Sequence, residues 1–210
     1  MSIRHFAMLA AVAALGLLAL GSASASATTS LRTDPGGGLL SGTTTIRNTT
    51  SDPVVFETLA GTITCNQAFF DADVNSNAGA ASITGTLTSL TFTSCTDTLL
   101  AINVSDCTLH AASMPTVQIA ATATGGTITL RHTVVRCAVG PTTACYFTTV
   151  NATGAAVNAT RSIDFTASVT AVTPTSDAAP AGNCLSTASL SWRFTHIVSA
   201  TNATVTVTTS

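Results

Sequence analysis

The six cysteines are the residues of this sequence with the clearest chemistry. They are Cys65, Cys95, Cys107, Cys137, Cys145 and Cys184. No two of them have the C-x-x-C spacing of a redox motif, and no two histidines have the spacing of a zinc finger. Nothing near Cys137 and Cys145 would lower a thiol pKa, as a redox pair requires. The even number therefore favours up to three structural disulfides, with no metal ligand among the cysteines.

One cysteine pair has a local reason to form. Two β-like runs flank Gly140-Pro141, a turn signal, and a hairpin there would place Cys137 opposite Cys145. We therefore predict a Cys137–Cys145 disulfide. The other cysteines would then form two further pairs: Cys65 with Cys95, since each follows a Thr-rich run, and Cys107 with Cys184.

Beyond the N-terminal 27 residues, the chain has three histidines: His110, His132 and His196. No G-x-S-x-G or H-E-x-x-H motif accompanies them, so a hydrolase would have to assemble its site from distant residues. His110 or His196 near an Asp or Ser would be the sign of such a site. His132 lies on the same face of a β-like run as Ile128, Leu130 and Val134, which favours a histidine in or beside the core. We predict no catalytic residue, no metal ligand and no cofactor.

Two carboxylates, Asp71 and Asp73, share one face of a β-like run. Calcium needs six to eight oxygen ligands, so we interpret these residues as two solvated carboxylates on an exposed strand face and not as a calcium site.

For stacking on a sugar, the first rings to consider are Trp192, Tyr146 and Phe69. The alternation of Leu190, Trp192 and Phe194 instead predicts that Trp192 lies in the core.

The elements that would position these residues are β-strands. Apolar residues alternate with Thr, Ser, Asp or Arg in Ile163–Val169, Leu190–Phe194 and Ala203–Thr208, which indicates one buried and one wet face. In Ile83–Phe92 the apolar side changes midway, which predicts a bulge near Ser89 or a strand that crosses between sheets. About ten to twelve such segments predict an all-β fold, an antiparallel β-sandwich with Greek-key-like connections, stapled by disulfides.

The first residues have the pattern of a secretory signal peptide. Arg4 and His5 precede an apolar run, Phe6–Leu20, and two Ala-x-Ala sites end at Ala25 and Ala27. We predict a signal helix over residues 1–27 that is cleaved after residue 25 or 27, a flexible lead over 28–38 and one all-β domain over 39–210. The apolar run is too short to span a bilayer, so the mature chain is predicted to be secreted, without an integral membrane span.

The amino-acid composition limits the kinds of partner that the protein can bind. The chain has 42 Thr and 21 Ser among 210 residues, seven Arg, one Glu and no Lys, and its formal net charge is −2. No cluster of basic residues exists that would neutralise phosphates, so nucleic acid is excluded as a partner. Thr is β-branched and polar, and it suits the solvent face of a sheet.

The placement of Thr, Gly and Cys carries a family resemblance. Ile63-Thr64-Cys65, the run from Ile83 to Thr96, and Val134–Cys137 resemble small exported bacterial β-proteins of unassigned function. More remotely, the Thr-Cys runs resemble secreted surface and biofilm-matrix proteins named as activators of alkane oxidation. The resemblance spans residues 58–195 and implies a surface or matrix role without a known enzyme activity.

Three functions follow as expectations. The first is a secreted, non-enzymatic structural or adhesive domain at the cell surface, with envelope or matrix components or further copies of the chain as partners. The second is a secreted binding module for carbohydrate or a small apolar ligand. The third is the hydrolase with a site made from distant residues.

Overall fold

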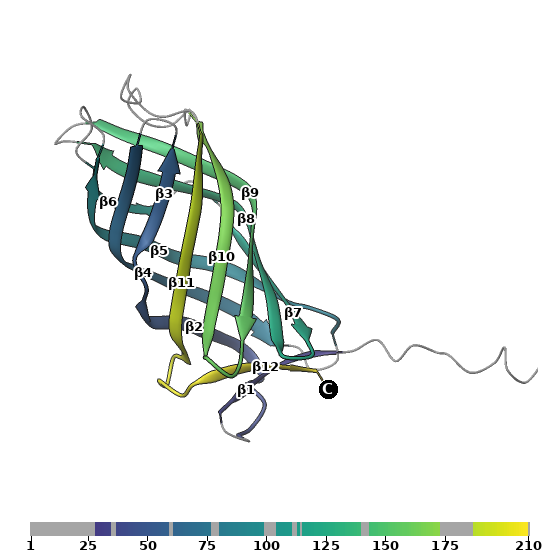
Figure 1. Ribbon diagram of the computed structural model, residues 1–210. Coiled ribbons are helices and arrows are strands. Elements are labelled where there is room, and N and C mark those ends of the chain that lie inside the picture. The colour runs from purple at the N-terminus through teal and green to yellow at the C-terminus, as the bar shows by residue number, and fades with distance from the viewer. Residues whose placement is uncertain are drawn as a thin grey trace, which may run out of the picture.

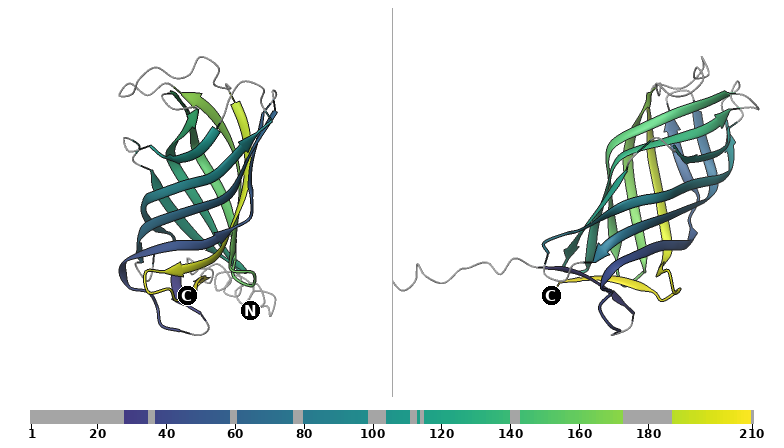
Figure 2. Two further views of the ribbon diagram at one scale, coloured as in Figure 1. Left: turned by 90° about the vertical axis from the view of Figure 1, so that its left-hand side faces the viewer. Right: turned by 180° about the vertical axis from the view of Figure 1, so that it is seen from behind.

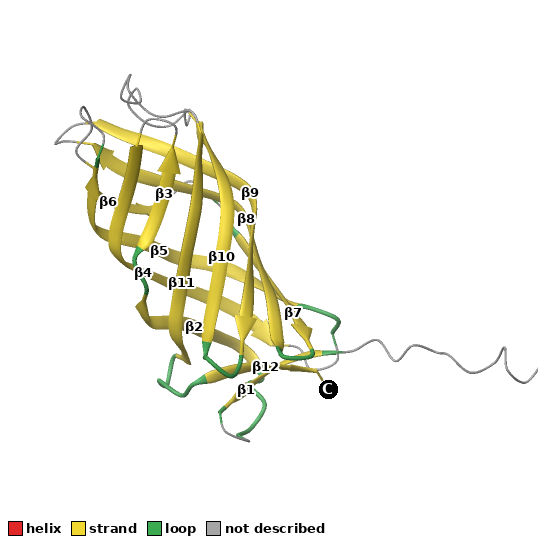
Figure 3. Ribbon diagram, viewed as in Figure 1, coloured by secondary structure: helices red, strands yellow, loops and turns green. Residues whose placement is uncertain are grey.

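The computed structural model describes residues 28–34, 37–58, 61–76, 80–98, 104–110, 113, 115–139, 143–172 and 187–209. Every regular element in these ranges is a β-strand, and all paired strands are antiparallel (Figure 3). The all-β, antiparallel prediction is therefore confirmed. The predicted signal helix and Cys184 lie outside the described residues.

The described residues form twelve strands. They are β1 (Thr29–Thr33), β2 (Gly42–Ser51), β3 (Val54–Thr58), β4 (Gly61–Ser76), β5 (Ile83–Asp97), β6 (Val104–Leu109), β7 (Thr116–Thr122), β8 (Gly125–Val139), β9 (Thr143–Val157), β10 (Ser162–Val172), β11 (Thr187–Ser199) and β12 (Val205–Thr209).

Ten of these strands form one sheet that closes on itself. Strands β4, β5, β8, β9, β10 and β11 each occupy one position in the ring. Strands β2 and β3 share the position between β11 and β4, and β6 and β7 share the position between β5 and β8. The ring therefore has eight positions, six single and two shared. Closure pairs the strands on both sides and removes the free edges of an open sheet.

Two walls of this closed sheet face each other across the core, as the two layers of a sandwich do. In Figure 1, β3, β10 and β11 run nearly upright in front, and β4 and β5 slope behind them. The walls are continuous because the long strands bend and belong to both. From β7 to β11 each strand pairs with the next in sequence, so these connections run up and down instead of in a Greek-key order.

At such a bend in β8, the side of the strand that faces the core changes. Leu130 and Thr133 are both buried, whereas Arg131 and His132 between them are both exposed. His132 has a left-handed backbone with φ of 55°. Two successive outward residues move the buried set from even to odd positions. The prediction of a core or rim position for His132 is therefore wrong, because its strand changes face at this residue.

The predicted bulge near Ser89 is confirmed. Ser89 pairs with Asp71, but the next pair is Leu87 with Ala72, so Thr88 is an extra residue in β5. Leu87 and the core residue Leu90 can then both point inward, three positions apart.

The core is apolar and contains an aromatic cluster. Trp192 stacks on Phe165 with ring centroids 4.7 Å apart, and Phe92 and Phe194 meet Trp192 edge to face. The expected burial of Leu190, Trp192 and Phe194 is confirmed.

A two-stranded ribbon of β1 and β12 lies across one end of the closed sheet (Figures 1 and 2). Within the segment predicted as a flexible lead, Thr29–Thr33 form β1 and pair with β12 in register. Leu31 is 1% exposed in this ribbon, and the Ser30 and Thr208 hydroxyls are hydrogen-bonded at 2.9 Å. Burial of one apolar side chain and pairing to the last strand hold this segment in place.

Two disulfides join directly opposite residues of neighbouring strands in the closed sheet. The Cys65–Cys95 bond is present as predicted, between opposite residues of β4 and β5. Cys137 is bonded to Cys107 instead of Cys145, so the predicted Cys137–Cys145 and Cys107–Cys184 pairs are wrong. Cys137 lies directly opposite both Cys107 in β6 and Cys145 in β9, and local sequence reveals only the hairpin neighbour. Cys145 is also disulfide-bonded.

Candidate functional site

A row of uncharged polar side chains runs around the outside of the closed sheet. Its members pair from strand to strand and all lie at least partly exposed: Thr43, Asn75, Thr84, Gln118, Thr129, Thr153, Thr166 and Ser191. Neighbouring strands lie about 4.8 Å apart, so hydroxyl and amide groups repeat at that interval. We call this set the hydroxyl row.

One part of the hydroxyl row lies in a surface trough of about 650 Å³. Three strands supply two polar side chains each: Asp73 and Asn75 from β4, Thr84 and Thr86 from β5, and Thr116 and Gln118 from β7. Thr43 on β2 and Arg131 on β8 line its sides. We call this site the polar trough.

Hydrogen bonds orient the two charged groups of the polar trough. The Thr45 hydroxyl donates to Oδ1 of Asp73. Nη2 of Arg131 donates to Oε1 of Gln118 at 2.9 Å, and Nε2 of Gln118 donates to the Ser82 hydroxyl at 3.0 Å. One carboxylate and one guanidinium balance each other, while hydroxyls and amides between them offer donors and acceptors. This arrangement suits a neutral ligand rich in hydroxyl groups.

Most other charged side chains that the structure describes on the surface are paired. Arg47 Nε lies 3.3 Å from Asp71 Oδ1, and Arg161 Nη2 lies 2.6 Å from Asp34 Oδ2. Arg193 meets both Asp52 and Asp164. The hydrogen bond and the negative charge of Asp164 raise the pKa of Arg193 above its already high ordinary value. These exposed pairs contribute little stability, but they leave an exterior of low charge.

The candidate residues for metal binding and hydrolysis are not brought together. Asp71 pairs with Arg47, and in the described ranges no three His, Cys, Asp or Glu side chains form a group that could hold a metal ion. His132 on β8 and His196 on β11 are exposed, with β9 and β10 between their strands. His110 is buried against Tyr146, with ring centroids 5.3 Å apart and the rings edge to face.

The rings considered for sugar stacking do not line the polar trough. Trp192 and Tyr146 are buried, and Phe69 is half-buried on β4. Of the trough residues, only Asp73 stood out in the sequence, because Thr, Asn and Gln carry no motif. Only the pairing of five strands aligns them.

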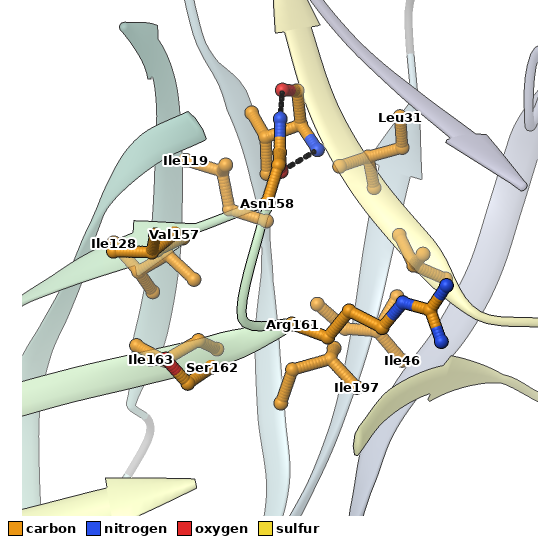
Figure 4. A pocket seen from close by; sticks show the side chains of 13 residues that line it. Leu31, Ile46, Ile119, Ile128, Val157, Asn158, Arg161, Ser162, Ile163 and Ile197 are labelled. Atoms are coloured by element: carbon orange, nitrogen blue, oxygen red, sulfur yellow. Dashed lines mark hydrogen bonds between the residues drawn. The ribbon is translucent and has the colours of Figure 1, made fainter. Parts of the chain in front are cut away.

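The interior offers little room for a ligand. Under the β1–β12 ribbon, Leu31, Ile119 and Ile197 line an apolar void of about 20 Å³ (Figure 4). Beside it, Asn158 makes the two hydrogen bonds to Val207 that Figure 4 marks with dashed lines. Two further voids in the core measure about 10 and 20 Å³. Pockets for small molecules usually measure about 300–1,000 Å³, so these voids are far too small for an apolar cargo molecule.

The fold and the site together define a class of protein: a closed antiparallel sheet with a packed apolar interior and a neutral, hydroxyl-rich exterior. No family model matches the chain, and no curated protein or solved structure is detectably similar to it. Across the described residues there is no helix with the length and apolarity needed to cross a bilayer.

Proposed function

We propose that this protein is an exported, non-enzymatic surface domain that adheres to a neutral, hydroxyl-rich polymer of the cell envelope or matrix. The observation that carries the proposal is the hydroxyl row, which runs in register over eight strands and passes through the polar trough. A polysaccharide presents repeated hydroxyl groups that both donate and accept hydrogen bonds, as these side chains do.

Side-chain contact is favoured over strand addition as the means of adhesion. Addition of a strand to a neighbouring chain needs a free edge, and the closed sheet has lost its edges. In the separate β1–β12 ribbon, Asn158 occupies the backbone N–H and carbonyl of Val207 on β12. Each exposed hydrogen bond contributes only about 0.5–1.5 kcal/mol. Adhesion therefore depends on many weak contacts along a polymer, and it is insensitive to salt because the polymer carries no charge.

Export supports the same role. The first residues resemble a signal peptide, and two disulfides between strands suit an oxidising compartment. The resemblance to surface and matrix proteins of bacteria points in the same direction.

Sedimentation with insoluble neutral glucan and with purified cell envelopes tests the proposal. The mature protein should sediment with either one and remain bound in 1 M NaCl. A triple variant, Thr84→Val, Thr86→Val and Thr116→Val, keeps the side-chain shape but removes three hydroxyls of the polar trough. We expect its bound fraction to fall at least five-fold.

The matched control is Thr91→Val with Thr108→Val, which removes paired outer hydroxyls of β5 and β6 outside the polar trough. This variant should bind as the unmodified protein does. Equal binding by the trough variant, loss of binding in salt, or no binding to either material would each overturn the proposal.

A further inference from the structure

Two polar atoms in the core lack a hydrogen-bond partner within the protein. They are Nε1 of Trp192 and Oγ1 of Thr133, in residues that are only 6% and 4% exposed. Both residues line the same void of about 20 Å³, together with Thr149 and apolar side chains that include Phe92 and Leu130. A buried donor or acceptor without a partner costs about 1–3 kcal/mol.

The polar lining has a structural origin. The change of face at His132 turns Thr133 into the core, and β9 changes face at the same level and turns Thr149 inward. The Thr149 hydroxyl donates to the Asn151 carbonyl at 3.0 Å, so its oxygen is left to accept. Trp192 on β11 offers only a donor, and Thr133 offers both a donor and an acceptor.

The void has room for one water molecule, and its walls are apolar except for Trp192, Thr133 and Thr149. A water molecule needs about 10–15 Å³ and two to four polar partners, whereas cavities with purely apolar walls stay dry. Here a water could accept from the Trp192 indole N–H, donate to the Thr149 oxygen and exchange a hydrogen bond with the Thr133 hydroxyl.

We propose that this void is a binding site for one ordered water molecule, held by Trp192, Thr133 and Thr149. The water connects β11 with β8 and β9 through the core. The site is separate from the polar trough on the outer face, and its occupancy does not depend on the function proposed above.

Nuclear magnetic resonance tests the site directly. Trp192 is the only tryptophan of the chain, so its indole N–H gives a single, separate resonance. In the unmodified protein this proton should show a cross-relaxation peak to a water molecule that resides for longer than a nanosecond. Absence of that peak would overturn the proposal whether or not any variant folds.

Two variants give the matched comparison. Thr133→Val keeps the shape of the side chain but removes the orphaned hydroxyl, and the water peak should be lost or fall at least five-fold. Thr153→Val removes an exposed hydroxyl of β9 and should leave the peak unchanged. An undiminished peak in Thr133→Val would overturn the assignment of Thr133 as a ligand of the water.

Discussion

Three residues with a left-handed backbone shape the strands of this protein: Ser94, His132 and His196, with φ of 54°, 55° and 52°. Each is exposed, and each precedes a buried residue: Cys95, Thr133 and Ile197, respectively. A side chain in this conformation costs about 1–2 kcal/mol, which glycine avoids. These positions therefore combine local strain with a change of face that the closed sheet requires.

Replacement of His132 by glycine should stabilise the protein. The removed strain exceeds the extra entropy that glycine gives the unfolded chain, so we expect a gain of about 0.5–1 kcal/mol in the free energy of unfolding. Urea denaturation with intact disulfides measures it. Thr153→Gly, at an ordinary strand position, should destabilise, and equal losses for the two variants would contradict this account.

Replacement of Gly154 by alanine should destabilise the core. A Cβ at Gly154 would lie 2.8 Å from two carbons of the Phe165 ring, which stacks on Trp192 and cannot easily move. Overpacking of this kind costs about 1–3 kcal/mol. Thermal unfolding followed by Trp192 fluorescence measures the loss, and an unchanged melting temperature would show that the ring can shift.

At the scale of elements, the β1–β12 ribbon depends on one side chain outside it. Asn158, in the turn between β9 and β10, donates to the Val207 carbonyl at 2.6 Å and accepts from the Val207 N–H at 3.0 Å. Its amide thereby occupies backbone groups of β12 that an additional strand could otherwise bind.

Replacement of Asn158 by alanine should loosen the ribbon. We expect a loss of about 1–2 kcal/mol and faster hydrogen exchange at the Val207 amide, since both hydrogen bonds disappear. Asn151→Ala, an exposed change in β9, serves as the control. Unchanged exchange at Val207 in Asn158→Ala would show that pairing with β1 alone protects β12.

At the scale of the whole molecule, both ends of the closed sheet are secured, but by different means. The β1–β12 ribbon covers one end, whereas the Cys65–Cys95 and Cys107–Cys137 bonds lie near the other. Each bond joins neighbouring strands over a sequence separation of 30 residues. A disulfide that closes such a loop contributes about 3 kcal/mol.

Reduction should lower the melting temperature and open the disulfide-bonded end first. Hydrogen exchange should rise at the start of β4 and the end of β8 before it rises in β1 and β12.

Peptide mapping of the unreduced protein should recover Cys65 linked to Cys95 and Cys107 linked to Cys137. A peptide linking Cys137 to Cys145 would contradict the pairing.

The sequence by itself determined the local properties of the strands. Alternation in Leu190–Phe194 predicted which side chains are buried, and the change of side in Ile83–Phe92 predicted the bulge beside Ser89. Such properties depend on residues a few positions apart, whose side chains point to opposite faces by the geometry of the backbone. The hydroxyl-rich character of the exterior was also readable from composition.

Only the tertiary structure decided which strands are neighbours. Closure of the sheet, the bond from Cys137 to Cys107 and the outward position of His132 depend on pairings between distant segments. The polar trough takes its residues from five strands, so no short stretch of sequence contains it. Pairing is decided by the burial of the whole apolar face at once, and a single strand does not encode its partner.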